Sequence, residues 1–283
     1  MKILVTGGAG FVGSNLCERL AEDPNNEVWS LDNYSTGTRD NHVPNVTYIT
    51  GPTSDISLLG FKPDIIYHLG EYSRVEQSFE DIETVWKYNV EGTFQVLQFA
   101  RVTGAKLIYA GSSTKFGDNG PDSSPYAFSK STNTQLVQNF AEWYGIEYAI
   151  TYFYNVYGHR EISTGKYATL IAKFMEKVRN NETLTVTSPG SQQRNFTHVD
   201  DIVDGLVLVG ANGQGDGYGI GSPEAYTVLE IAEMFGSPIE MTPERKGNRM
   251  FGPVVSDKTK ELGWAANRRV ADYIKNFTDS LRS

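Results

Sequence analysis

Short apolar runs rich in β-branched residues recur along the first half of this chain, and stretches with apolar residues at helical spacing lie between them. The runs cover residues 3–5, 27–31, 46–49, 65–68, 107–110 and 148–152. The helical stretches include residues 15–22, 84–102 and 126–144. Strands that alternate with helices form parallel sheets, and the helices then cover both faces of the sheet. The pattern predicts an α/β fold built on a doubly wound parallel sheet.

The pattern loosens after the sixth run, where mixed helices, short strands and turns with glycine or proline follow. Residues 188–191 and 213–221 are interpreted as such turns. We therefore predict that residues 1–158 form the sheet domain and that residues 159–283 form a smaller mixed α/β C-terminal lobe that closes over a substrate. An apolar pattern near residues 194–212 predicts a segment that returns to the sheet.

Composition disfavours several classes of function. With 283 residues and a net charge of -9, the chain is long enough for a sizeable core but too acidic for nucleic-acid or anionic-membrane binding as its main activity. A local cationic pocket for a small anion remains compatible with this charge. The single cysteine, Cys17, has no internal disulfide partner, and the start at Met1 lacks the regions of a signal peptide, so we expect a cytosolic protein. No apolar run reaches the roughly 20 residues of a membrane-spanning helix.

A glycine-rich turn follows the first predicted strand directly, with Gly7, Gly10 and Gly13 at the spacing of a dinucleotide-binding motif. Gly7 would permit the tight turn out of the strand, and Gly10 would let backbone N–H groups approach a pyrophosphate. Gly13 would let the next helix pack close to the sheet. A glycine-rich turn without a ligand is the alternative interpretation. Together with the strand and helix alternation, the turn favours a Rossmann-type fold.

Asp32 ends the second predicted strand about 20 residues after the glycine-rich turn. A carboxylate there can accept hydrogen bonds from the ribose hydroxyls of an adenosine, which weakens the interpretation without a ligand. The same carboxylate would repel a 2′-phosphate, and the neighbouring Asn33 and Tyr34 supply no arginine to offset the repulsion. The sequence therefore predicts NAD rather than NADP.

Tyr126 and Lys130 lie four residues apart at the start of a predicted helix, so their side chains share one helix face. Lys130 and an oxidised nicotinamide would together lower the pKa of the phenol from about 10 toward neutrality. Tyr126 would then serve as a general base for a substrate hydroxyl. This spacing is common, and a Tyr–Lys pair on an ordinary surface helix is the alternative. The Tyr126–Lys130 pair indicates a catalytic site only in combination with the other motifs of the chain.

Several further motifs accompany these features in a fixed order. They are HLGEYSRVEQS (68–78), AGSSTKFG (110–117), YNVYG (154–158), QQRNFTHVDDIVDG (192–205), ERKGNR (244–249) and SDKTKELGW (256–264). In this set and order, over nearly its full length, the chain resembles the extended short-chain dehydrogenase/reductase family. Within that family it is most similar to the NAD-dependent nucleotide-sugar epimerases of the UDP-glucose/UDP-galactose 4-epimerase type. Such an ordered set is far more specific than any single motif.

The resemblance implies roles for individual residues. Ser112 matches the hydroxyl that bonds the reacting sugar oxygen, Tyr126 the catalytic base, and Lys130 the residue that lowers the pKa of the base and holds the ribose. The residues that match positions around NAD are Gly7, Gly10, Phe11, Val12, Asp32, Asn33, Ser35, Thr36, Gly37, Leu69, Gly70, Asn89, Tyr126, Lys130 and Tyr154. The residues that match positions around the substrate are Ser112, Asn155, Arg194 and Arg245. Cationic donors suit a nucleotide diphosphate, although each arginine alone is also compatible with a solvated surface charge.

The resemblance also implies the chemistry, in which hydride passes from a sugar carbon to NAD while Tyr126 takes the hydroxyl proton. Dehydratases of the family carry an acidic pair directly after the hydroxyl residue, and its sugar-acid decarboxylases keep a glutamate in that stretch. This chain has Ser113 and Thr114 there. Epimerisation needs no extra acid, because the keto-sugar only has to rotate and take hydride back on its other face. We expect epimerisation of a nucleoside-diphosphate hexose, first of all a UDP-sugar, at carbon 4.

Other functions stay open at this point. An NAD-dependent nucleotide-sugar oxidoreductase would use the same residues, and the sequence does not exclude it. A dehydratase is a further alternative, which the absence of the acidic pair disfavours. A non-catalytic NAD-binding protein would keep the glycine-rich turn, but the joint presence of Ser112, Tyr126 and Lys130 argues against it.

The chain departs from the family pattern near the cofactor and near the sugar. Pro52 stands where an aspartate commonly bonds the adenine, so that contact is absent or comes from another residue such as Asp55. The segment 117–126 is shorter than the family's loop. Glu71, Tyr72 and Arg74 replace small residues after His68. Glu71 and Arg74 would either bind an unusual polar or charged sugar or pair with each other at the pocket rim.

Other residues have simpler interpretations. Cys17 fits a small core position on the first helix, and His198 fits a cap or turn before a helix from Ile202. No cluster of His or Asp has metal-ligand spacing, so we predict no metal. The predicted helices 84–102 and 126–144 match the family's dimer faces, so we expect a homodimer. The aromatic residues that would supply contacts there, or would equally pack against the sheet, are Trp86, Phe94, Phe140 and Trp143.

Overall fold

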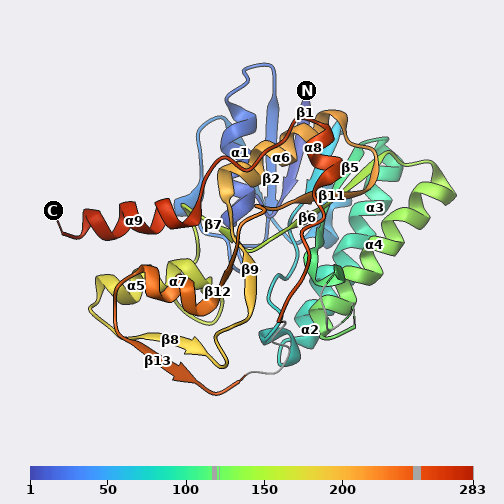
Figure 1. Cartoon of the computed structure of the whole chain (residues 1–283). Helices are drawn as coiled ribbons and strands as arrows, with labels where there is room; N and C mark the ends of the chain where they lie inside the picture. The colour runs from blue at the N-terminus through green and yellow to red at the C-terminus, as the bar shows by residue number, and fades with distance from the viewer. Residues whose placement is uncertain (117–119, 121, 245–249, 283) are drawn as a thin grey trace.

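A parallel sheet of seven strands forms the centre of the molecule (Figure 1). The computed structural model describes residues 1–116, 120, 122–244 and 250–282. The strands run in the order β11-β6-β5-β4-β1-β2-β3. Their bounds are β1 (Lys2–Thr6), β2 (Glu27–Asp32), β3 (Val46–Thr50), β4 (Ile65–His68), β5 (Lys106–Ser112), β6 (Tyr148–Phe153) and β11 (Gly215–Ile220). The first six lie where the apolar runs predict them, and the predicted α/β fold with a Rossmann-type doubly wound sheet is confirmed.

The seventh strand, β11, corrects the prediction of a turn over residues 213–221. It pairs in parallel with β6 at the edge of the sheet, and its register shifts between Gly215 and Tyr218. Its glycines are typical of a turn, but Gly219 is needed because another chain segment packs directly against it. A Cβ atom at Gly219 would lie 1.7 Å from the carbonyl oxygen of Val255. The strand therefore tolerates glycine because another chain segment passes directly over it.

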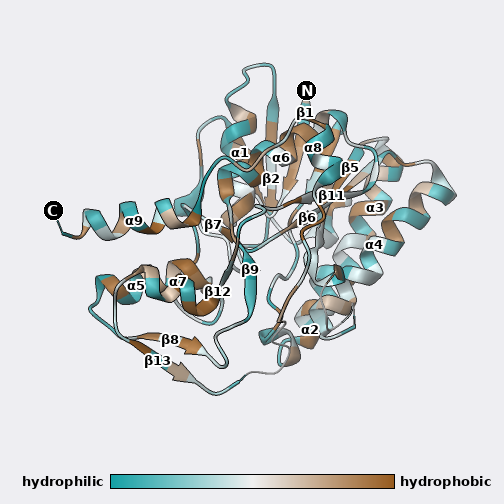
Figure 2. Ribbon diagram, viewed as in Figure 1, coloured by the Kyte–Doolittle hydropathy of each residue, from teal (hydrophilic) through white to brown (hydrophobic). Residues whose placement is uncertain are grey.

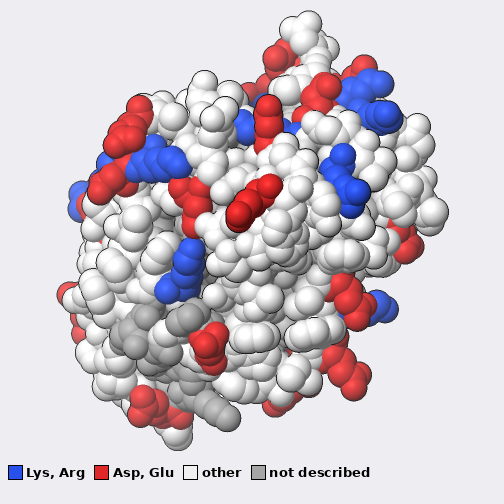
Figure 3. Space-filling model, turned by 90° about the vertical axis from the view of Figure 1, so that its right-hand side faces the viewer, with Lys and Arg blue, Asp and Glu red and all other residues white. Residues whose placement is uncertain are grey.

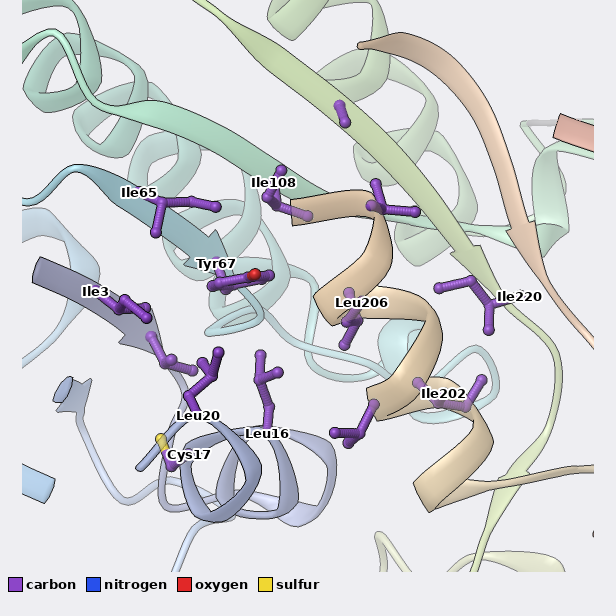
Figure 4. Close-up of a cluster of buried hydrophobic side chains, with 14 of the residues drawn as sticks. Ile3, Leu16, Cys17, Leu20, Ile65, Tyr67, Ile108, Ile202, Leu206 and Ile220 are labelled. Carbon is purple, nitrogen blue, oxygen red and sulfur yellow. The ribbon is translucent and has the colours of Figure 1, made fainter. Parts of the chain in front are cut away.

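One face of the sheet is covered by α1 (Phe11–Ala21) and α6 (Val199–Asn212). Figure 4 shows side chains from both helices, among them Leu16 and Leu206, packed against the strands. Cys17 is fully buried in this cluster, which confirms its prediction as a core residue.

His198 caps the N-terminus of α6, because its Nδ1 accepts a hydrogen bond from the backbone N–H of Asp200 at 3.2 Å. The predicted cap is confirmed, although the helix starts at Val199, three residues before the predicted Ile202. α6 falls within the segment near 194–212 that was expected to return to the sheet, and it packs there.

The other face of the sheet is covered by α3 (Gly92–Thr103) and α4 (Pro125–Tyr144). Phe140 of α4 is only 3% exposed and belongs to the core on this side, so it cannot lie on an outer dimer face. The predicted helix over 84–102 is not continuous. It consists of α2 (Ile82–Val85), a π-helical segment η4 (Trp86–Glu91) and α3, and such π segments often mark functional sites.

The second lobe has an apolar core of its own. Its main elements are α5 (Leu170–Arg179), β8 (Leu184–Thr187), α7 (Val228–Met234), β13 (Ile239–Thr242) and α9 (Val270–Ser280). Phe174, Ile231 and Phe277 pack together from three of its helices. Figure 2 shows β8 and β13 as hydrophobic and α5 as two-sided, as expected for a helix over a small sheet.

Shorter elements complete the chain. They are the 3-10 helices at Arg39–Asn41, Thr53–Leu58, Gln77–Phe79 and Ser113–Phe116, the paired strands β7 (Val156–Tyr157) with β10 (Thr197–His198) and β9 (Gln193–Asn195) with β12 (Ala225–Thr227), and α8 (Asp257–Glu261). Among the helices of the described ranges, none is long and apolar enough to cross a membrane.

Candidate active site

A cleft of about 680 Å³ lies at the carboxyl ends of the central strands and extends to the second lobe. Gly7, Asp32 and Ser112 line it from the ends of β1, β2 and β5, and Phe174 and Thr187 line it from the second lobe. The strand order reverses between β1 and β4, which is where open α/β sheets bind ligands. The volume is in the range of small-molecule sites.

The glycine-rich turn has the geometry that its sequence predicts. Gly7 has a φ of +73°, and a Cβ atom there would lie 2.9 Å from the Cα of Gly70. A Cβ atom at Gly13 would lie 2.1 Å from the carbonyl oxygen of Gly7, so the helix meets the turn at a distance that only glycine permits. Gly10 is the N-cap of α1 and lines the cleft. The N-terminus of α1 is therefore placed to face a phosphate group.

Asp32 is almost completely buried at the end of β2 and lines the cleft. Its carboxylate accepts hydrogen bonds from the backbone N–H of Ala9 at 2.9 Å and of Tyr34 at 2.8 Å. These bonds fix the carboxylate between the glycine-rich turn and the chain after β2. A carboxylate has about four lone-pair positions, so it can still accept bonds from a ribose diol.

Most residues predicted to surround NAD line this cleft. They are Gly7, Gly10, Phe11, Val12, Asp32, Asn33, Ser35, Thr36, Leu69, Gly70, Tyr126 and Lys130.

Three residues predicted to bind the cofactor do not line the cleft. Gly37 packs against the backbone of Ala9, where a Cβ atom would be 2.9 Å away. Tyr154 is a core residue, 1% exposed, and its hydroxyl accepts a hydrogen bond from the backbone N–H of Val255 at 3.0 Å. Asn89 is fully buried in η4.

Asn89 holds the loop that follows β4. Its Oδ1 accepts from the N–H of Tyr72 at 2.7 Å, and its Nδ2 donates to the carbonyl of Tyr72 at 3.1 Å and to Ser129 Oγ at 2.9 Å. The Asn89 side chain therefore holds the backbone of Tyr72 in place. A match to a family motif alone does not distinguish this structural role from direct contact with the cofactor.

Of the two alternatives for the adenine contact, the one that relies on Asp55 is not supported by the position of this residue. Asp55 is exposed, its carboxylate accepts a hydrogen bond from the Ser54 hydroxyl at 3.3 Å, and it does not line the cleft. Gly51 and Thr53, on either side of Pro52, line the cleft instead.

The three residues predicted to be catalytic are brought together on the wall of the cleft. Ser112 is the last residue of β5, and its Oγ accepts hydrogen bonds from the Thr114 hydroxyl at 2.9 Å and the Thr114 N–H at 3.3 Å. Tyr126 lies in the first turn of α4, which Ser124 caps by accepting from the N–H of Ala127 at 3.0 Å. The cap fixes where α4 begins and so where Tyr126 stands.

Lys130 follows one turn later and is almost completely buried. Its ammonium donates to the carboxylate of Glu71 and to the backbone carbonyl of Ala110. Glu71 also accepts from three neutral donors, which are Thr93 Oγ1 at 2.9 Å, Asn133 Nδ2 at 2.9 Å and Tyr109 OH at 3.1 Å.

Arg74 lies farther along the same loop and lines the cleft. Its guanidinium donates to the carbonyl of Tyr167 at 2.6 and 3.0 Å and to Ser73 at 3.1 Å. Burial lowers the pKa of this guanidinium. Of the two alternatives for Glu71 and Arg74, their pairing with each other is wrong, because Glu71 pairs with Lys130 instead.

Glu161 is a residue of the cleft that the sequence did not single out. Burial raises the pKa of its carboxyl group to about 7. One oxygen accepts from the N–H of Gly158 at 3.0 Å, and the other is buried without a hydrogen-bond partner. Glu161 lies in a loop with no hydrophobic periodicity, and only its position just after YNVYG could have drawn attention to it.

The residues predicted to hold the nucleotide diphosphate have different outcomes. Asn155 and Arg194 line the cleft. The Asn155 amide donates to the carbonyl of Asn195 at 3.1 Å, which ties it to the strand that carries Arg194. Arg245 lies outside the described residues. Within the described residues, no group of three or more His, Cys, Asp or Glu side chains is placed to hold a metal ion.

Comparison with known proteins gives consistent matches over the whole chain. The model of the NAD dependent epimerase/dehydratase family matches residues 3–221. UDP-glucuronic acid decarboxylase 3 of Arabidopsis thaliana is 32% identical over 313 residues, which cover 100% of this chain and 89% of that protein. The solved structure of UDP-glucose 4-epimerase from Thermotoga maritima with UDP-glucose has a TM-score of 0.90 at 28% identity and covers 100% of this chain and 99% of that one. The Thermus thermophilus UDP-glucose 4-epimerase complex with NAD has the same TM-score and coverage at 25% identity.

Proposed function

The chain belongs to the NAD-dependent epimerase/dehydratase family, and we propose that it is an NAD-dependent nucleotide-sugar epimerase. The proposed reaction is inversion at carbon 4 of a nucleoside-diphosphate hexose, with a UDP-sugar as the preferred substrate. One observation carries the proposal. Ser112, Tyr126 and Lys130 line the same cleft as the glycine-rich turn.

NAD is the cofactor of this reaction, and the residues present fit it. A side chain at Gly13 would collide with the glycine-rich turn, and one at Gly7 would collide with the backbone of Leu69 and Gly70. Gly10 at the N-terminus of α1 lines the cleft, where it can approach a pyrophosphate, and Asp32 offers a fixed carboxylate to a ribose diol. Bound NAD supplies a hydride acceptor that can return the hydride to the sugar.

Tyr126 has the central role among the residues of the chain. Its phenolate removes the proton of the sugar hydroxyl and later returns it, so one group serves both directions. Ser112 Oγ accepts from Thr114, which leaves the serine proton available to the reacting sugar oxygen. Lys130 lies one helix turn from Tyr126 and is placed to hold the ribose of NAD, and its ammonium acts on the phenol only as far as the ion pair with Glu71 leaves its charge uncompensated.

The nucleotide half of the substrate is assigned to the second-lobe side of the cleft. Asn155 and Arg194 line the cleft there, and a guanidinium suits a diphosphate. Arg245 is proposed as a further diphosphate ligand on its sequence match alone. Residues 1–158 with the returning segment would form the NAD-binding domain, and residues 159–283 would form the smaller substrate lobe. Asn155 and Arg194 belong to the sheet domain and the returning segment and would reach the nucleotide sugar from there.

Decarboxylation and dehydration are the competing reactions, because relatives with these activities share the fold. In the family pattern, both reactions accompany a further acidic residue beside the hydroxyl residue. Ser113 and Thr114 occupy those positions, and Thr114 is engaged with Ser112. Epimerisation remains the reaction that the present side chains can complete.

The direct test is to incubate the purified protein with a panel of UDP-, GDP-, dTDP- and CDP-sugars, separate the products by chromatography, and record mass and NADH absorbance. We expect a stereoisomer of equal mass, no net NADH, and loss of the reaction in Tyr126→Phe. Loss of carbon dioxide or water, or accumulation of NADH, would assign the protein to another reaction of the family.

We also propose that the protein is a homodimer that associates through α3 and α4. Phe94 on α3, Trp143 on α4 and Trp86 beside them are 41%, 58% and 51% exposed. Figure 3 shows this side of the molecule, and uncharged residues cover most of it. Exposed aromatic residues on two neighbouring helices suit a self-complementary interface.

A further inference from the structure

Glu71 is an ionisable residue in the proposed active site without a role in the reaction described above. Its carboxylate is 3% exposed and forms an ion pair with Lys130. We propose that Glu71 is a positioning residue that fixes Lys130 and neutralises much of its charge, and thereby sets the pH at which Tyr126 can act as a base. This inference rests on the proposed function only in taking Tyr126 as that base.

The carboxylate of Glu71 is fully enclosed by donors. Oε2 accepts from Lys130, and Oε1 accepts from Thr93, Tyr109 and Asn133. These partners come from α3, β5 and α4, whereas Glu71 follows β4. A buried carboxylate that accepts from this many donors is held in one position.

Lys130 is fixed by the same contacts. An ammonium has three N–H donors, and two of them bond Glu71 and the carbonyl of Ala110. Lys130 lines the cleft, so the third donor can reach a bound ribose. The ammonium is thus already oriented before any ligand arrives.

The pairing also changes the charge that Tyr126 senses. An isolated ammonium near a phenol favours the phenolate, but an ammonium paired with a carboxylate favours it less. The two opposite charges lie together one helix turn from Tyr126. Tyr126 should therefore hold its proton to a higher pH than it would beside Lys130 alone.

Other titratable groups around the pair do not substitute for Glu71. Burial lowers the pKa of His68 to about 4, so this histidine is neutral, and it reaches Glu71 only through Thr93. Burial raises the pKa of Tyr109, which stays protonated. Arg74 interacts electrostatically with Tyr126 itself, but its guanidinium is present in the parent and in the variants at Glu71, Tyr109 and Lys130, so it does not change the comparison. Glu161 also lines the cleft, and among the described residues it forms no ion pair with Lys130.

Glu71→Gln tests the proposal, because it keeps the side-chain size and removes the charge. The ionisation of Tyr126 is followed by tyrosinate absorbance in the NAD complex, with a matching Tyr126→Phe protein subtracted from each trace. We expect Tyr126 to ionise about one pH unit lower in Glu71→Gln than in the parent. An unchanged ionisation pH, or an upward shift, would overturn the proposal.

Tyr109→Phe is the matched control. It removes one hydrogen bond to Glu71 and leaves every charge in place. We expect Tyr126 to ionise at the parent pH in this variant. If it shifts Tyr126 as much as Glu71→Gln does, then loosened packing rather than charge explains the effect, and the proposal fails.

A second variant covers the case in which Glu71→Gln does not fold, since it leaves a buried ammonium unpaired. Glu71→Gln with Lys130→Met removes both charges together. We expect Tyr126 to ionise near the parent pH in this double variant, because the pair carries little net charge. A rise of more than about one unit would show that Lys130 acted as an uncompensated cation and would contradict the proposal.

These titrations use no sugar substrate. If the sugar-nucleotide panel shows no epimerisation, the proposed function fails while the titration still decides the role of Glu71. If the panel succeeds and Tyr126 does not shift, the function stands and the role of Glu71 fails.

Discussion

At the residue scale, Ser112 illustrates how neighbouring side chains set the direction of a proton. Thr114 donates to the Ser112 oxygen with both its hydroxyl and its backbone N–H. The serine oxygen is thereby satisfied as an acceptor, and its own proton is directed elsewhere. In the proposed reaction that proton bonds the sugar oxygen.

Ser112→Ala should lower kcat by about 10- to 100-fold and change KM little, since the lost bond strengthens as charge develops on the sugar oxygen. Steady-state kinetics with the preferred sugar nucleotide would show this. Ser113→Ala is the matched control, because it alters the next hydroxyl in the chain, and we expect a markedly smaller loss. Equal losses in the two variants would contradict the role assigned to Ser112.

The sequence predicts which residue types meet in the cleft, but not every contact that they make. The motif positions of Ser112, Tyr126 and Lys130 are local and readable. The partner of Glu71 depends on how β4 and α4 approach each other. The sequence offered a sugar or Arg74 as that partner, and neither alternative is the observed ion pair with Lys130. The contacts of Asn89 were not predictable for the same reason, because its partners come from the loop after β4 and from α4.

At the element scale, the joint between the glycine-rich turn and α1 has no space for a side chain. Gly13→Ala would place a methyl group against the carbonyl of Gly7, so we expect a loss of about 1 to 3 kcal/mol in the free energy of unfolding and weaker NAD binding. Chemical denaturation and NAD titration measure both effects. Gly60→Ala is the control, since no atom lies within 4 Å of the added methyl group. A Gly13→Ala protein with parent stability and parent NAD affinity would contradict this packing.

His68 connects β1 to α3 as a neutral imidazole. Its Nδ1 is 2.7 Å from Thr6 Oγ1 and its Nε2 is 2.9 Å from Thr93 Oγ1. Burial lowers its pKa to about 4. Between about pH 6.5 and pH 4 the unfolded chain therefore binds a proton that the folded protein does not, and stability falls as the pH falls.

The difference in unfolding free energy between the parent and His68→Gln should decrease by about 3 kcal/mol from pH 7 to pH 4, because glutamine does not titrate. Urea denaturation across this range measures the difference, and subtraction removes the contribution of Glu161 and other groups common to both proteins. A difference that stays constant with pH would show that His68 is not held neutral.

Apolar periodicity predicts elements well where burial alone decides them. The strands on both sides of β1 and the helix α4 belong to this class. The sequence did not predict β11, because its glycines fit a turn as well as they fit a strand. Only the folded chain shows that Val255 passes over Gly219 and requires glycine there. The π segment η4 was missed because it lies inside a regular helical pattern.

At the scale of the whole molecule, the side that carries α3 and α4, which uncharged residues mostly cover, should join two copies. Trp143→Glu places a charge in the proposed interface, and we expect it to raise the dimer dissociation constant on the order of 100-fold. Light scattering at several concentrations would measure the mass. Met241→Glu is the control, because Met241 is exposed on β13 in the second lobe. A parent that is monomeric at all concentrations would contradict the proposal.

The arrangement of lobes follows only partly from the sequence. Strand and helix alternation predicts the sheet, and the order of motifs predicts a cleft at its carboxyl edge. The chain then crosses between lobes more than once, since α6 and β11 lie with the sheet although they follow β8 and precede β13. The return of α6 follows from the apolar pattern near residues 194–212, whereas the return of β11 depends on long-range packing that its glycine-rich sequence does not indicate.

The central claim is that the protein inverts a sugar carbon by transient oxidation with NAD that is recycled. The most direct measurement is incubation with UDP-glucose carrying deuterium at carbon 4, followed by mass spectrometry and NMR of the product. We predict UDP-galactose of unchanged mass with deuterium still at carbon 4, and a rate at least about 100-fold lower in Tyr126→Phe. Loss of the deuterium to solvent, or a product of different mass, would contradict the claim.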